Sequence, residues 1–249
     1  MSIVESVINM ECTQIQLRLA VPQDLPFIAE VAAQAMLNDE LFAFLCPRRK
    51  DYYSDYRRGF LRRLRTKLKA PGWVIVVAVV NSPAYPSTDS MHIVGYSVWE
   101  RIGESTEAGT GKQGEVEQGW LNNIQENIWD LGDQLFSWLY PDRSVDRSHL
   151  AAYSALTEEC FPYSAYPKLW FLSTLAVHPD YQRQGIGRKL VEWGLGQAAR
   201  EQMPVGLEAS AKGTYLYHSL GFRTVNEMPL IENITLRAMI WDLPKDAHN

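Results

Sequence analysis

The chain has 249 residues, of which 46% are hydrophobic and 21% charged, so it can bury the core of one large domain. A formal net charge of −5 argues against a nucleic acid or an anionic membrane as partner. Three widely spaced cysteines provide neither a disulfide framework nor metal-ligand spacing, and no stretch resembles a signal peptide or a membrane span. We therefore expect a cytoplasmic protein without a metal, folded as a single domain over residues 1–249.

The N-terminal part of the sequence alternates between helical and strand patterns. Residues 52–69 form the longest helix predicted there, in which Tyr56, Phe60, Leu64 and Leu68 recur every four positions along one face. We interpret the many Arg and Lys side chains of this helix as a solvated face, because the chain as a whole is acidic. The other elements predicted here are a strand at 15–19, helices at 28–37 and 39–45, and strands at 73–80 and 92–100 that flank a turn-rich linker at 81–90.

A long insertion separates the strand at 92–100 from the next strand. Residues 104–114 are rich in Gly, Glu and Ser and are expected to be flexible. Apolar residues at spacings of three and four predict a helix over 115–140, and a second helix is expected over 146–159. The helical insertion therefore spans about 104–165.

The segment from 170 to 200 is predicted to form a strand, a tight turn and a helix. Residues 170–177 are mostly apolar, and His178-Pro179-Asp180 ends the strand because proline cannot continue a ladder. The helical pattern is clear from Arg188 onward. The intervening loop, Gln182-Arg183-Gln184-Gly185-Ile186-Gly187, leads into a helix start, where unpaired N–H groups favour an anion such as phosphate.

This loop fits one of three known phosphate-binding patterns. It lacks the third glycine of the dinucleotide fingerprint G-x-G-x-x-G, and it lacks the Walker sequence G-x-x-x-x-G-K-[ST]. Gln182, Gly185 and Gly187 satisfy the pattern [QR]-x-x-G-x-[GA], which binds the pyrophosphate of coenzyme A. In this loop the chain resembles the GNAT superfamily of acyl-CoA-dependent N-acyltransferases.

A second segment strengthens the resemblance. A strand at 205–210 precedes a helix at 212–220, and Gly221 is expected to cap that helix. The run from Tyr217 to Phe222 resembles the Y-x-x-[LM]-G-F element of the superfamily. Over about 90–225, with its phrases LWFLSTLAVHPDYQRQGIG and LEAS, the chain resembles the puromycin N-acetyltransferase-like branch. Residues 223–232 are expected to form a loop or a strand, and 234–243 a final strand.

The resemblance implies a GNAT fold of the mixed α/β class, with a central sheet of about seven strands flanked by helices and the helical insertion over the acceptor side. It also implies an acetyl-CoA-dependent N-acetyltransferase, in which a primary amine of a small molecule attacks the thioester directly. Two alternatives remain open, namely a protein or peptide N-acetyltransferase and a non-catalytic acyl-CoA sensor. The expected partners are acetyl-CoA and a small amine, and the protein is expected to be a monomer or homodimer.

The same resemblance implies which residues hold acetyl-CoA. Backbone groups of Leu175, Ala176 and Val177 are expected to pair with the pantetheine arm, and the Val177 N–H to polarise the thioester oxygen. Ser210 stands where the superfamily often has Asn, and its hydroxyl is expected to contact pantetheine. The pyrophosphate is expected to bind the loop and helix start formed by Gln182, Arg183, Gln184, Gly185, Ile186, Gly187 and Arg188.

Acyl transfer to an amine also needs an acid and a base. Tyr217 is the predicted acid and CoA contact, because a phenol with a pKa of about 10 can protonate a thiolate whose reference pKa is about 8.5. Glu100 is the first choice as base. The other candidate carboxylates are Glu208 on the strand at 205–210 and Glu158 and Glu159 on the insertion.

Overall fold

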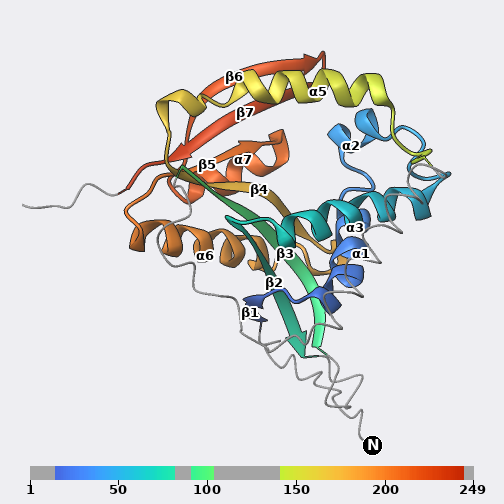
Figure 1. Ribbon diagram of the computed structural model, residues 1–249, viewed down its shortest axis with the longest axis horizontal. Coiled ribbons are helices and arrows are strands. Elements are labelled where there is room, and N and C mark those ends of the chain that lie inside the picture. The colour runs from blue at the N-terminus through green and yellow to red at the C-terminus, as the bar shows by residue number, and fades with distance from the viewer. Residues whose placement is uncertain (1–14, 82–90, 104–140, 244–249) are drawn as a thin grey trace, which may run out of the picture.

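The computed structural model describes residues 15–81, 91–103 and 141–243. The predicted flexible segment at 104–114 and the predicted helix at 115–140 lie outside these residues, as does most of the linker at 81–90. The described residues form one seven-stranded sheet in the order β1-β2-β3-β4-β5-β7-β6, and helices cover it on both faces (Figure 1). All neighbouring strands are antiparallel except β4 and β5, which are parallel. The predicted mixed α/β sheet is confirmed.

The predicted elements match the observed ones closely, apart from a few residues at their ends. The strands are β1 (Ile15–Leu19), β2 (Trp73–Asn81), β3 (Met91–Ile102), β4 (Leu169–Val177), β5 (Val205–Ala209), β6 (Arg223–Ile231) and β7 (Ile234–Trp241). The helices are α1 (Leu25–Ala35), α2 (Glu40–Leu45), α3 (Tyr53–Lys69), α5 (Arg147–Cys160), α6 (Ile186–Arg200) and α7 (Ala211–Ser219).

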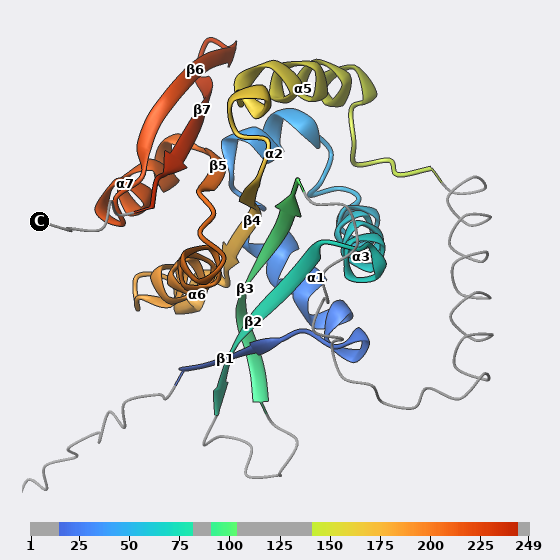
Figure 2. The same ribbon diagram turned by 60° about the vertical axis from the view of Figure 1, so that its left-hand side comes forward.

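The sheet is buried on both faces over β2 and β3. Ile75 and Val77 of β2 pack with α1 and α3, whereas Val76 and Ala78 pack with α6. Burial on both sides explains why the sequence of β2 is apolar at every position rather than alternating. Figure 2 shows α6 on one side of these strands and α1 and α3 on the other. We call these sides the α6 face and the α3 face; α7 lies on the α6 face, and α5 on the α3 face.

β6 is the element that the sequence left undecided between loop and strand. It is a nine-residue strand at the edge of the sheet, paired only with β7 among the described strands. Its ladder is irregular at two places, between Thr224 and Asn226 and between Pro229 and Ile231. Proline and register irregularities are tolerated at a sheet edge, and there they obscure the two-residue alternation that identifies a strand.

Packing between α6 and β3 gives a test of the fold. A Cβ atom at Gly194 would overlap the ring of Trp99, which is fully buried. Gly194→Ala is therefore expected to lower the free energy of unfolding by about 1–3 kcal/mol, measured by urea titration. Gly196→Ala is the matched control, because a Cβ there meets nothing within 4 Å. An alanine in that open helical position is expected to leave stability unchanged or raise it. Equal stability of the two variants would contradict this account.

Candidate active site

The parallel pair β4 and β5 separates partway along its length. Pairing runs from Trp170 opposite Val205 to Leu172 opposite Leu207 and then stops. β4 remains paired with β3 as far as Val177. Beyond Leu172, the edge of β4 that faces β5 therefore has no strand partner within the described part of the chain. We call this opening the β4–β5 split.

A β-bulge sets which backbone groups face the split. Val98 pairs with Thr174 but Trp99 pairs with Leu172, so Ser173 is the extra residue of β4. Beyond the bulge, the His178 N–H donates to the Val94 carbonyl over 2.8 Å. Antiparallel strands alternate the direction of their backbone groups, so those of Leu175 and Val177 point away from β3 and into the split. Ala176, in contrast to the prediction, directs its backbone groups toward β3.

The glycine loop leads from the end of β4 into α6. Gly185 caps α6 with a φ of 80°, a left-handed conformation that favours glycine, and a Cβ there would meet nothing within 4 Å. Arg183 also has a positive φ, of 63°, and its side chain is exposed. The first N–H groups of α6 have no partner within the helix, and they lie beside this open loop. The loop therefore presents N–H donors and a cationic side chain to solvent.

Several side chains of the loop and of the first turn of α6 form hydrogen bonds with other groups of the chain. The Gln182 side chain donates to the Val177 carbonyl over 3.1 Å, which ties the loop to the end of β4. Arg188 donates to the Ser219 hydroxyl over 2.6 Å and so links α6 to α7. The Gln184 side chain donates to the Asp180 carbonyl over 3.4 Å. Of the predicted loop residues, Gln182 and Gln184 therefore use their side chains to shape the loop, and Arg188 uses its side chain to join α6 to α7.

Tyr217 is held at the end of α7 by the cap that the sequence predicts. Gly221 has a φ of 90°, its N–H donates to the His218 carbonyl, and the Phe222 N–H donates to the Tyr217 carbonyl. This is a Schellman cap, and it includes contact between the rings of Tyr217 and Phe222, whose centroids lie 5.7 Å apart. Tyr217 packs in the core of the α6 face, and burial raises the pKa of its hydroxyl.

Two other residues of the β5–α7 segment have clear local positions. Ser210 caps the start of α7, where its hydroxyl accepts a hydrogen bond from the Gly213 N–H. A hydroxyl that accepts a hydrogen bond keeps its own proton, so Ser210 can still donate to a ligand. Tyr215, two residues from Tyr217, is 85% exposed and points away from the core.

Glu208 lies on the α3 face of β5, next to the split. Its Oε1 atom is buried and has no hydrogen-bond partner. Burial raises the pKa of Glu208 to about 7, because little surrounds the carboxylate that could stabilise its charge. This carboxyl group can therefore exchange a proton close to neutral pH.

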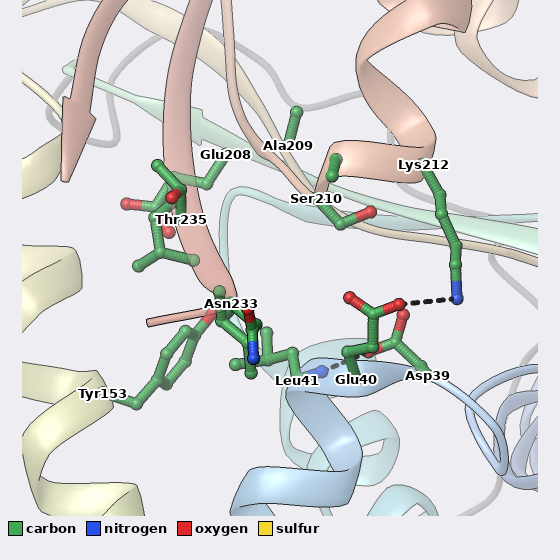
Figure 3. A pocket seen from close by; sticks show the side chains of 13 residues that line it. Asp39, Glu40, Leu41, Tyr153, Glu208, Ala209, Ser210, Lys212, Asn233 and Thr235 are labelled. Carbon is green, nitrogen blue, oxygen red and sulfur yellow. Dashed lines mark hydrogen bonds and ion pairs between the residues drawn. The ribbon is translucent and has the colours of Figure 1, made fainter. Parts of the chain in front are cut away.

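Glu208 and Ser210 line a hollow of about 520 Å³ on the same face, a volume that includes space open to solvent. Its other walls come from the start of α2, from Tyr153 of α5, and from the β6–β7 hairpin (Figure 3). Asp39 and Glu40 place two more carboxylates in the wall. The Lys212 Nζ forms an ion pair with the Glu40 Oε1 over 3.5 Å. The hollow is therefore predominantly acidic, and α5 of the predicted insertion forms part of it.

Glu100 lies on the same face as Glu208 but on the other side of β4. It pairs with Phe171 in the β3–β4 ladder. Burial raises the pKa of Glu100, and the positive charge of Lys67 opposes that rise. Burial also raises the pKa of Tyr163, and the negative charges of Glu208 and Glu100 raise it further. Glu158 and Glu159 are exposed on α5.

The sequence interpretation missed Lys67, because it treated the basic residues of α3 as one solvated face. The Lys67 Nζ donates to the Ser173 hydroxyl over 2.6 Å and lies 4.3 Å from the centre of the Trp73 ring. A signal was present: Lys67 follows Phe60 and Leu64 at spacings of seven and three, which places it on the buried stripe of the helix.

Within residues 15–81, 91–103 and 141–243, no group of three or more His, Cys, Asp or Glu side chains is arranged to hold a metal ion. None of the described helices is long and apolar enough to cross a membrane.

Comparisons with known proteins find acetyltransferases among the chains similar to this one. A family model described as "Acetyltransferase (GNAT) domain" matches residues 146–224. A protein of Stachybotrys chartarum named "Acetyltransferase" is 25% identical over 212 residues, which cover 85% of this chain and 82% of that protein. A "Probable acyltransferase SID5" of Ajellomyces capsulatus is 33% identical over 64 residues, covering 25% of this chain and 47% of that protein.

Two solved structures share the fold. One is described as histone acetyltransferase HPA2 and related acetyltransferase, from Corynebacterium glutamicum. It has 18% sequence identity and a TM-score of 0.55 over 94% of this chain and 99% of that chain. The other is arylalkylamine N-acetyltransferase 2 from Aedes aegypti. It has 13% identity and a TM-score of 0.56 over 93% of this chain and 100% of that chain.

Proposed function

This chain belongs to the GNAT superfamily of N-acetyltransferases, and on that premise we propose that it transfers an acetyl group from acetyl-CoA to a primary amine of a small molecule. One observation carries the proposal. Two groups suited to proton transfer lie on opposite faces of the sheet: Tyr217 packs in the core of the α6 face, and Glu208 follows Leu207, the last β5 residue paired with β4, on the α3 face. A thioester held in the split would expose its sulfur toward one face and its carbonyl carbon toward the other.

The donor is held along the edge of β4. The pyrophosphate binds the N–H groups at the start of α6, and the pantetheine arm then extends along β4, pairing with backbone groups as an added strand would. Val177 lies at the loop end of this edge, and Leu175 lies further along it. We therefore assign the polarisation of the thioester oxygen to the Leu175 N–H and an earlier contact with the arm to Val177.

Glu208 is our choice as the general base. An aliphatic amine with a pKa of about 10.4 arrives mostly protonated, and a carboxylate with a pKa of about 7 can take its proton directly or through water. The unpartnered Oε1 of Glu208 leaves an acceptor site free for this purpose. Glu100 is less suitable, because the positive charge of Lys67 favours its ionised form and so weakens it as a base.

Tyr217 is our choice as the general acid. A phenol with a reference pKa of about 10 is protonated at neutral pH, and burial raises the pKa of Tyr217 further, so its hydroxyl holds a proton that it can donate to the departing thiolate of coenzyme A. Its cap holds the ring in one position, so the hydroxyl needs little reorganisation when the sulfur leaves.

Tyr217→Phe tests that role. We expect kcat to fall by about 10²–10³-fold, because the leaving group loses its proton donor, while the Kd for acetyl-CoA changes little. Steady-state kinetics and calorimetry measure the two quantities. Tyr215→Phe removes a hydroxyl from an exposed ring on the same helix and is expected to leave both unchanged. A kcat that is equal in the two variants would remove Tyr217 from the mechanism.

The acidic hollow supports a small cationic amine as the acceptor. Asp39, Glu40 and Glu208 are partly offset by Lys212, and the remaining negative charge attracts an ammonium group. The walls formed by α5 and the β6–β7 hairpin restrict the hollow, which favours a compact acceptor over an extended peptide.

The acceptor class can be tested by competition. The protein is incubated with acetyl-CoA and equal concentrations of small amines and lysine-containing peptides, and the acetylated products are identified by mass spectrometry. The panel contains aminonucleosides, aminoglycosides, polyamines and arylalkylamines. We expect a small amine to be acetylated preferentially. Acetylation of peptides alone would establish the protein-acetyltransferase alternative, and binding of acetyl-CoA with no acetylated product would favour the sensor.

A further inference from the structure

Lys67 is a lysine with neutral partners next to the proposed acyl site. Its Nζ contacts the Ser173 hydroxyl and the Trp73 ring, and none of the ion pairs among the described residues includes it. Burial and the nearby charge of Arg63 lower the pKa of Lys67 to about 8, against the weaker attraction of Glu100. A substantial fraction of this side chain is therefore the free amine at neutral to slightly alkaline pH, unlike an exposed lysine.

The position of Ser173 places this amine at the split. Ser173 is the bulge residue, directly after the last β4 residue paired with β5 and two residues before Leu175. Lys67 reaches it from α3, so its Nζ lies on the α3 face. Glu208 and the acidic hollow are on that same face, and there the acceptor amine would approach the thioester.

Resting on the proposed function, we propose that Lys67 is an internal acyl acceptor, which takes the acetyl group from bound acetyl-CoA when no amine substrate is present. The Nζ lone pair forms a bond to the thioester carbonyl carbon, and the carbon–sulfur bond breaks. The leaving thiolate takes a proton from the Tyr217 hydroxyl, and the nitrogen releases its proton to water, which returns one to Tyr217. The products are acetyl-lysine and the free thiol of coenzyme A.

The modification has a consequence for turnover. Acetylation removes the positive charge over the Trp73 ring and adds bulk on the α3 face beside the split. The acetylated protein is therefore expected to process amines more slowly. An amine substrate protects Lys67 by competing for the same thioester.

The test is a time course of lysine acetylation in the full chain. The protein is incubated with acetyl-CoA and no amine, and each lysine is followed by peptide mass spectrometry. We expect Lys67 to be acetylated at least about tenfold faster than the exposed Lys189 and Lys212, and its rate to rise with pH through about 8. Gly187→Asp, which is expected to bind acetyl-CoA much more weakly, should lose most of the labelling of Lys67 but keep the slow labelling of the surface lysines.

Labelling of Lys67 no faster than Lys189 would overturn the inference. So would equal labelling in the Gly187→Asp variant, because that result would indicate reaction from solution. The inference and the proposed function can fail separately. Turnover of an amine without labelling of Lys67 would reject the inference alone, whereas labelling of Lys67 without turnover of any amine would reject the proposed acceptor alone.

Discussion

Gly187→Asp is expected to weaken acetyl-CoA binding by at least about 10²-fold while the protein stays folded. A Cβ at this position meets only ordinary contacts, the closest being Leu216 at 3.6 Å, so the side chain fits. A carboxylate in the first turn of a helix is favoured by the unpaired N–H groups there. The new carboxylate would therefore occupy the donors that we assign to the pyrophosphate and repel its charge.

Calorimetry with acetyl-CoA measures this effect, and Gly196→Asp is the matched control. Gly196 is on the same helix and is exposed, and a Cβ there meets nothing within 4 Å, so the substitution makes the same change of charge away from the loop. We expect the control to bind as the wild type does. Unchanged binding by Gly187→Asp would show that the pyrophosphate lies elsewhere.

Glu208→Gln is expected to lower kcat by about 10²–10⁴-fold, the usual contribution of a general base. Glutamine keeps the size of the side chain but cannot take a proton. In the wild type, kcat/KM should rise with pH through about 7 as Glu208 ionises, and this limb should be absent from the residual activity of the variant. Glu100→Gln is the control, and a larger loss of kcat there would assign the base to Glu100.

Stability provides a second readout for Glu208. Because its pKa is raised in the folded protein, the folded state favours the protonated carboxyl group. The stability this provides is fully present below the unfolded pKa of about 4.5 and is lost as the pH rises through about 7. Glu208→Gln should therefore raise the thermal midpoint relative to wild type at pH 8 and have little effect at pH 4. A loss of stability at pH 8 would contradict the unpartnered state of this carboxylate.

The sequence predicts the fold and the course of the glycine loop well because both depend on local patterns. The strand, proline turn, glycine loop and helix from 169 to 200 follow from apolar periodicity and glycine positions. The cap at Gly221 follows from the sequence alone, and it fixes Tyr217. These features need no knowledge of distant neighbours.

The remaining features depend on contacts between distant segments. The direction of the Ala176 backbone depends on a bulge opposite Val98, which the apolar run of β4 does not reveal. The choice of Glu208 over Glu100 as the general base depends on which carboxylate has a cation beside it. Glu100 has one, Lys67, which belongs to the distant helix α3. The alternation and spacing of apolar residues cannot supply such information, because these patterns describe one segment of the chain at a time.

The most direct test of the central claim is the initial rate of thiol release by the wild-type protein, with acetyl-CoA and the preferred small amine varied together. Direct attack in a ternary complex predicts that the rate saturates in both substrates and that the double-reciprocal lines intersect. Parallel lines would indicate a covalent acetyl-enzyme intermediate and contradict direct attack. No thiol release with any amine, although acetyl-CoA binds, would contradict the assignment of this site as a small-amine acetyltransferase.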